Sequence, residues 1–189
     1  GTYTTDAKSF HLTGLPGDAG ISLEIGFNGI FRHGYWTPIR IDVLARNEPL
    51  EGQLIFRIPS AHLLSSQPSY THVSVPIDLP AGHQRRQWVN WPLLGIPYPL
   101  EIAFADSSER EIATYAFVLR QAATDGPIIL VLDPEGQSWA WLGDASTEES
   151  TTLPSRRLGV EGTAVSYVYR PEDVPSQAMA LIALTAVIV

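Results

Sequence analysis

A cluster of aromatic side chains is the feature of this sequence with the clearest capacity to bind a ligand. Trp88 and Trp91 flank Val89 and Asn90, and Tyr98 follows a short distance later. Aromatic rings present a large apolar surface, so an exposed ring on a β-sheet can stack against a sugar or a partner protein. Side chains three apart on a regular strand point to opposite faces, so we expect one of the two tryptophans to lie in the core. The cluster therefore predicts either packing or recognition of a glycan or protein through Trp88, Trp91 and Tyr98.

Metal and covalent chemistry have little support in the residue pattern. The chain has no cysteine, which excludes disulfides, a thiol nucleophile and cysteine-ligated metals. Glycine-rich phosphate loops and the G-x-S-x-G serine elbow are absent from the sequence. The histidines lack the i, i+4 and i, i+2 spacings of a local metal site, and we interpret them as surface or turn residues. They are His11, His33, His62, His72 and His83. We predict no catalytic residue, no metal and no cofactor.

The charge distribution excludes some classes of partner. The 189 residues carry a formal net charge of −8. Residues 1–122 hold 9 basic against 11 acidic residues, and residues 123–189 hold 3 against 9. Nucleic acids and anionic lipid surfaces both attract clustered basic side chains. We therefore expect no nucleic-acid partner and no docking on acidic head groups.

The stretch 21–59 organises the first two-thirds of the chain, and we read it as three consecutive strands. Ile39, Ile41 and Val43 alternate with polar residues at a period of two, which is typical of a half-buried antiparallel strand. The segment 54–58 repeats the alternation, and the polar segment 46–52 predicts a hairpin-type connection between the two. We expect Trp36 to be a core anchor at the end of the sheet, with a binding aromatic as the alternative.

Short strands recur along residues 1–122 with turn signals between them. Their spacing of roughly ten residues favours an antiparallel β-sandwich of the Ig-like kind, without the cysteine pair of immunoglobulins. The further predicted strands are 10–12, 70–79, 84–91, 100–105 and 112–119.

The character of the chain changes near residue 122. The continuous apolar run 128–132 predicts a strand buried on both faces of a parallel sheet. Asp133 and Pro134 suit a helix start, with a hairpin turn at 133–136 as the alternative. Further strands at 164–169 and 186–189 and a helix from about Ser176 complete a β-α-β-α-β order. We therefore predict an Ig-like β-sandwich over 1–122 and a partial flavodoxin-like α/β domain over 123–189.

Two passages of the sequence resemble a known type of protein. The pattern from Gly26 to Arg40, GFNGIFRHGYWTPIR, is similar to the start of an Ig-like module in large bacterial membrane-associated proteins. In those proteins a class I glutamine-amidotransferase-like, flavodoxin-like domain follows, and the passage PEDVP at 171–175 resembles part of it. The resemblance implies a fragment outside the cytoplasm, in the envelope of a bacterium, with a membrane-anchored parent protein. The resemblance does not imply amidotransferase activity, because such enzymes need a cysteine nucleophile and this chain has no cysteine.

These observations lead to one functional hypothesis with two alternatives. We expect a non-catalytic structural or interaction module whose partner is a protein or the downstream domains of its own chain. The alternatives are a carbohydrate-binding sandwich and an accessory part of an enzyme whose active site lies beyond residue 189. The apolar segment 178–189 ends without a cap or polar tail, so we expect a piece of a longer protein. A homodimer of the fragment through the open edge of its parallel sheet is a further expectation.

Overall fold

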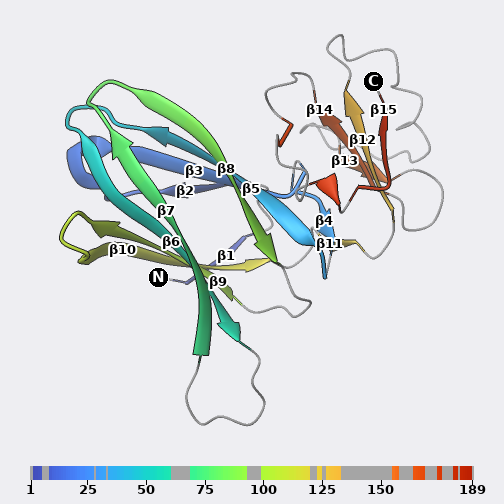
Figure 1. Cartoon of the computed structure of the whole chain (residues 1–189), viewed down its shortest axis with the longest axis horizontal. Helices are drawn as coiled ribbons and strands as arrows, with labels where there is room; N and C mark the ends of the chain where they lie inside the picture. Colours follow the sequence, from blue (N-terminus) through green and yellow to red (C-terminus); the bar gives the residue numbers. More distant parts are fainter. Residues whose placement is uncertain are drawn as a thin grey trace. The chain divides into compact units, whose positions relative to one another are not determined.

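The computed structural model describes residues 2–5, 9–27, 29–32, 34–60, 69–92, 99–119, 123–124, 127–132, 155–157, 164–168, 174–175, 181–182 and 184–188. Within these residues the chain is almost entirely β-strand, and most of the strand pairs are antiparallel (Figure 1). A short 3-10 helix, η1 (Pro16–Asp18), precedes the third strand. The fold is a β-sandwich followed by a smaller sheet.

One sheet of the sandwich has five strands in the order β1-β10-β9-β6-β7. Strands β6 and β7 form a long antiparallel hairpin, and β9 and β10 form a second one. The first strand joins the edge of the sheet parallel to β10. The bounds are β1 (Thr2–Thr5), β6 (Leu50–Ser60), β7 (Ser69–Leu79), β9 (Pro99–Asp106) and β10 (Glu111–Leu119).

The other sheet of the sandwich has four strands in the order β2-β3-β5-β8. Its bounds are β2 (Ser9–Leu12), β3 (Gly20–Ile25), β5 (Trp36–Leu44) and β8 (Gln84–Pro92). The alternation in β5 is as predicted, because Ile39, Ile41 and Val43 are buried while Arg40 and Asp42 face the other way. A two-stranded parallel pair, β4 (Phe31–Arg32) with β11 (Ala123–Thr124), forms a separate sheet.

The core of the sandwich comes from the alternating apolar positions of both sheets. Each of these side chains has at most 2% of its surface exposed, and burying one contributes about 1.5–3 kcal/mol. Leucine, isoleucine, valine and phenylalanine side chains fill it. The members are Leu12, Ile21, Leu23, Ile41, Val43, Leu50, Leu54, Phe56, Ile102 and Phe104.

The prediction that Trp36 anchors the core is wrong. Trp36 is 37% exposed and is the first residue of β5. It falls on the same alternation as Arg40 and Asp42, opposite to Ile39 and Ile41. The side of the strand, and not the size of the ring, decides which residues enter the core.

The connection between β5 and β6 also differs from the prediction. The two strands lie in different sheets, so the chain crosses the sandwich there and forms no hairpin. The second strand begins at Leu50, which places Gly52 inside it with φ of 155°. A Cβ at Gly52 would lie 2.2 Å from the carbonyl oxygen of Ala105 on β9. The glycine therefore marks a close approach of two strands and not a turn.

The third sheet is formed mainly by parallel strands in the order β13-β14-β12-β15. Its bounds are β12 (Ile128–Leu132), β13 (Ser155–Arg157), β14 (Ala164–Val168) and β15 (Ala186–Ile188). Both β14 and β15 pair with β12 in parallel, and β13 pairs with β14 antiparallel. The three predicted strands are confirmed, and the alternative hairpin turn at 133–136 lies outside the described residues. The helices predicted after Asp133 and Ser176 fall mostly outside the described residues.

The chain divides into two compact units. The first comprises Gly1–Leu23, Ile41–Val89 and Ile96–Gln121, and the second comprises Glu24–Arg40, Asn90–Gly95 and Ala122–Val189. Within the second unit, four residues from the 26–30 turn and from β12 share a buried apolar cluster, namely Phe27, Ile30, Ile128 and Leu130. The boundary predicted after residue 122 stays a prediction.

Candidate functional site

The three predicted aromatic binding residues have different surroundings. Trp91 has no exposed surface and is one of the largest fully buried side chains. The prediction that one of the two tryptophans is a core residue is therefore confirmed. Trp88 is half-buried on the opposite alternation of β8, and Tyr98 lies outside the described residues. Of the two residues that the structure describes, Trp91 has no accessible surface and Trp88 is the one that can contact a ligand.

Trp88 shares its side of β8 with an ion pair. Arg86, two residues earlier, points the same way, because successive side chains on a strand alternate. The Nε of Arg86 donates a hydrogen bond of 2.6 Å to Oδ1 of Asp42 on the neighbouring strand β5. The side chains of Arg86 and Asp42 are 39% and 32% exposed. This part of the sheet therefore combines an aromatic ring with an accessible donor and acceptor.

A second pair of charges lies between β3 and β5. Arg40 Nη2 is 2.7 Å from Glu24 Oε2, and their side chains are 21% and 15% exposed. The position of both residues on the outward alternation explains why the charges are tolerated in central strands. The pair links β3 to β5 through their side chains.

The largest group of charges is on the outward face of the five-stranded sheet. Nη1 of Arg57 donates to Oε1 of Glu101 at 2.8 Å and to Oε2 of Glu111 at 3.2 Å. Nη2 of Arg57 donates to Oε1 of Glu111. The backbone register places Arg57 directly opposite Glu101, so the first contact follows from the pairing of β6 with β9. One guanidinium thus ties together three strands.

The hydrogen bonds of this cluster shift the pKa values of Arg57 and Glu111 away from neutrality. The hydrogen bond from Arg57 lowers the pKa of Glu111 below its ordinary value, against the opposing effect of partial burial. The hydrogen bonds to Glu111 and Glu101 raise the pKa of Arg57. A general acid at neutral pH needs a carboxyl pKa raised toward neutrality, and the shift of Glu111 goes the other way.

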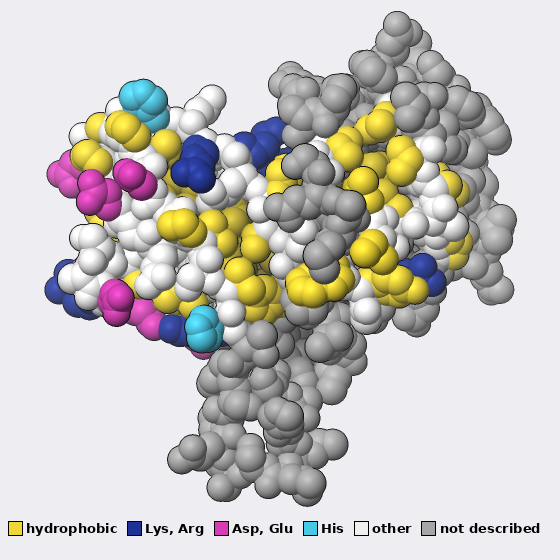
Figure 2. Space-filling model, viewed as in Figure 1, with side chains coloured by type: hydrophobic (Ala, Val, Ile, Leu, Met, Phe, Trp, Pro, Cys, Tyr) yellow, Lys and Arg dark blue, Asp and Glu magenta, His cyan; other side chains and the backbone are white. Residues whose placement is uncertain are grey.

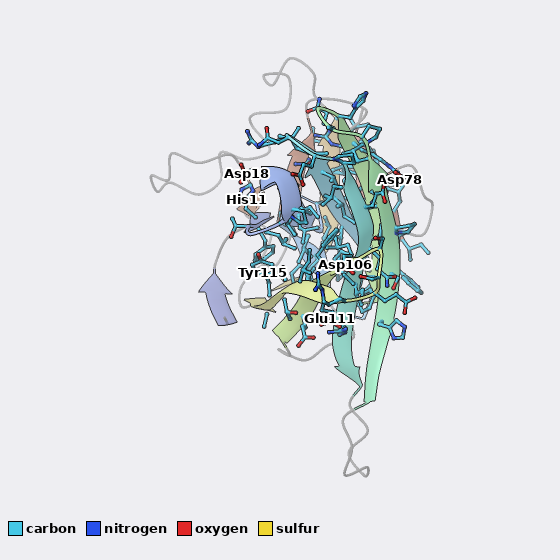
Figure 3. The ribbon with its side chains drawn as sticks, turned by 90° about the vertical axis from the view of Figure 1, so that its left-hand side faces the viewer. His11, Asp18, Asp78, Asp106, Glu111 and Tyr115 are labelled. Carbon is cyan, nitrogen blue, oxygen red and sulfur yellow. The ribbon has the colours of Figure 1, made fainter. Side chains whose placement is uncertain are left out.

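The turn between β9 and β10 is closed by Asp106. Its Oδ1 accepts hydrogen bonds from the hydroxyl of Ser108 at 2.7 Å and from the amides of Ser108 and Arg110 at 3.0 Å. The Ser108 hydroxyl bond and the Arg110 amide bond lower the pKa of Asp106. Asp106 and Glu111 lie at the same end of this hairpin, with Tyr115 farther along β10 (Figure 3). Both carboxylates therefore have structural partners.

Tyr115 connects β10 to the segment that follows β2. Its hydroxyl donates to the carbonyl oxygen of Thr13 and accepts a hydrogen bond of 2.9 Å from the amide of Thr13. One side chain thus satisfies both backbone groups of a residue that lies outside any strand.

No metal centre emerges from the part of the chain that the structure describes. No group of three metal-ligating side chains lies together among those residues. Three histidines, His11, His72 and His83, are exposed, and His33 and His62 lie outside the described residues. On the face shown in Figure 2, acidic and basic side chains both occur over the sandwich. No helix in the described part of the chain has both the length and the apolar character needed to cross a bilayer.

Sequence reasoning missed the charge pairs. Arg57 is 44 residues from Glu101 and 54 from Glu111, and Arg86 is 44 from Asp42. The alternation of each strand indicates that these residues face outward. Their partnership depends on which strands are neighbours and in which register, and local patterns carry no such information.

Comparison with known proteins gives one match. The model of a family described as a domain of unknown function, DUF8726, matches residues 18–120. The comparisons with curated proteins and with solved structures found no significant match. The matched range contains all strands from β3 to β10 and covers more than half of the 189 residues. The chain belongs to the DUF8726 family.

Proposed function

We propose that this chain is a non-catalytic structural or interaction module of a bacterial cell-envelope protein, located outside the cytoplasm. The observation that carries the proposal is the pairing of outward-facing charges across strands. Arg57 ties β6 to β9 and β10 through Glu101 and Glu111, and Arg86 ties β8 to β5 through Asp42. The hydrogen bond from Arg57 lowers the pKa of Glu111, which suits a structural ion pair and not proton transfer at neutral pH.

The strand order supports an Ig-like type of sandwich. Seven strands of the two sandwich sheets lie within the family match. In chain order they are β3, β5, β6, β7, β8, β9 and β10. The first, second and fifth share one sheet, and the third, sixth and seventh share the other. Strands A, B and E and strands C, F and G divide in the same way in Ig-like domains. The fourth strand, β7, pairs with the third.

The order of the last sheet supports a flavodoxin-like continuation. Its three parallel strands are, in chain order, β12, β14 and β15. In the sheet β12 lies between β14 and β15, which gives the spatial order 2-1-3. Flavodoxin-like sheets begin with the same 2-1-3 order. The resemblance of residues 171–175 to an amidotransferase-like domain is in line with it. The partners that follow are other domains of the parent protein or a separate protein at the envelope.

An assay for turnover tests the absence of catalysis. The purified chain is incubated with chromogenic ester, amide, glycoside and phosphate substrates. We expect no turnover above the uncatalysed rate. Turnover that disappears in Glu111→Gln or Glu101→Gln would refute the proposal, because those carboxylates would then take part in a reaction.

A protease-accessibility experiment tests the location. Spheroplasts of a bacterium that carries the gene are treated with a protease that cannot enter the cytoplasm. We expect the chain to be digested while a cytoplasmic marker protein stays intact. Protection of the chain until the cells are lysed would contradict an extracytoplasmic location.

A further inference from the structure

We infer that the outward surface formed by Trp88, Arg86 and Asp42 binds a neutral polysaccharide. The inference deepens the proposed function, on which it rests, by adding a glycan ligand to the protein partners of the interaction module. All three residues belong to the same compact unit and to the neighbouring strands β5 and β8.

The strand geometry places the three side chains on one face. Asp42 lies between Ile41 and Val43, which are 0% and 2% exposed, so it points away from the core. Arg86 contacts Asp42 and therefore points away from the core too. Residue 88 follows Arg86 by two, so the ring of Trp88 lies on the same face and next along the strand.

The partial burial of Trp88 is what a stacking surface requires. A ring packed into the core, such as Trp91, has no surface left for a ligand. A wholly exposed ring would lose side-chain entropy on binding, because nothing holds it beforehand. Trp88 is half-buried, so part of the residue is fixed by its neighbours and part of its surface stays accessible.

The ion pair beside the ring supplies the polar contacts that a sugar needs. A pyranose has C–H groups on its faces, which pack on an indole, and hydroxyl groups around its edge, which donate and accept hydrogen bonds. Asp42 offers acceptor oxygens and Arg86 offers N–H donors, and both are about one-third exposed. The two charges balance each other, which favours a neutral ligand over a phosphate or a polycation.

Among the described residues, the cluster around Arg57 and the exposed Trp36 each lack one part of this combination. The cluster around Arg57 has charged groups, but no tryptophan occurs in β6, β9 or β10. Trp36 is 37% exposed and lies at the beginning of β5, in the other compact unit. That residue serves as a matched control, because it is an exposed tryptophan outside the inferred surface.

Affinity electrophoresis of the full chain tests the inference. Native gels contain hydroxyethylcellulose, mixed-linkage β-glucan, xylan or glucomannan, and the migration is compared with a gel without polymer. We expect at least one polymer to retard the wild type and Trp36→Ala equally. Trp88→Ala should lower the affinity about tenfold or more, as for a central aromatic contact in other interfaces. Asp42→Asn, which keeps the size of the side chain, should weaken binding less, and thermal melting shows that each variant is folded.

Each outcome decides the inference. The inference is supported if retardation by the polymer is lost in Trp88→Ala but not in Trp36→Ala, and if it is weakened in Asp42→Asn. Retardation that survives Trp88→Ala, or that is lost in Trp36→Ala, places the sugar site elsewhere and overturns it. Absence of retardation with all four polymers overturns it as well. None of these results changes the turnover and protease experiments, so failure of the sugar site and failure of the proposed module are distinguishable.

Discussion

Replacement of Arg57 by glutamine removes the charge that ties three strands of the five-stranded sheet together. Arg57 bonds Glu101 and Glu111, and the three side chains are 24%, 34% and 40% exposed. An ion pair at such exposure contributes about 0.2–1 kcal/mol, so two pairs on one guanidinium contribute about 0.5–2 kcal/mol. Urea denaturation at pH 7 should show this loss in the free energy of unfolding. With a typical slope of about 1–3 kcal/mol per molar urea, the midpoint falls by a few tenths of a molar or more.

The destabilisation caused by Arg57→Gln should become smaller as the pH falls. The pKa of Glu111 is lower in the folded chain than its ordinary value of 4.5, so the unfolded chain binds more protons in that range. The stabilisation is therefore fully present above pH 4.5 and is lost as the pH falls through the lower pKa of the folded state. The difference in unfolding free energy between wild type and variant should narrow as the pH drops below about 4.5. Added salt should also narrow this difference in unfolding free energy, because salt screens the attraction between the charges.

Arg110→Gln is the matched control for this prediction. Arg110 pairs with one carboxylate, Asp106, at 3.2 Å and is 77% exposed, so its loss should cost less than about 0.5 kcal/mol. Equal destabilisation by the two variants would refute the reasoning. So would an Arg57→Gln effect that stays constant from pH 7 to pH 3, because that would be a packing effect and not an electrostatic one.

Three further substitutions test the packing of the sandwich by urea denaturation. Tyr115→Phe removes the hydroxyl that bonds both backbone groups of Thr13 and should cost about 1 kcal/mol, whereas no change would show that the contact is absent in solution. Gly52→Ala drives a Cβ toward the carbonyl oxygen of Ala105 and should cost about 2–4 kcal/mol, whereas a neutral effect would contradict the close approach of β6 and β9. Trp91→Ala empties a fully buried site and should cost about 3–5 kcal/mol, whereas a cost below about 1 kcal/mol would contradict its burial.

Two control variants accompany these substitutions. Gly82→Ala changes a turn glycine with φ of 75° and no heavy atom within 4 Å of the new Cβ, so it should cost only about 1–2 kcal/mol of backbone strain. Trp36→Ala removes an exposed ring and should cost less than Trp91→Ala.

The parts of the fold that follow from local patterns were predictable. Alternation of Ile39, Ile41 and Val43 gave the inward face of β5, and the apolar run at 128–132 gave a strand buried in a parallel sheet. In both cases the apolar or polar character of consecutive residues indicates which side chains are buried.

Features that depend on long-range pairing were not predictable. Turn-forming residues after β5 indicate that the chain reverses, but not that β6 joins the opposite sheet. Gly52 was taken for a turn residue because its role is defined by Ala105, far along the chain. The first strand, Thr2–Thr5, was missed, since it pairs at the sheet edge with β10 and lacks an alternation of its own.

The candidate site was predictable only in outline. The spacing of Trp88 and Trp91 correctly indicated that one ring is buried, but not which one. The role of Asp42 and Arg86 beside Trp88 required the register between β5 and β8. Exposure of Trp36 contradicted the expectation from ring size, because position on the strand overrides hydrophobicity at the end of a sheet.

A carboxyl titration by NMR tests the central claim that the charged groups of this chain are structural. The side-chain carboxyl carbons of all aspartates and glutamates are followed in the folded chain from pH 7 downward. The account predicts that Glu111 and Asp106 titrate below their ordinary pKa values. A pKa of Glu111 or Asp106 at or above its ordinary value would contradict the account, because the hydrogen bonds that lower these pKa values would then be absent in solution.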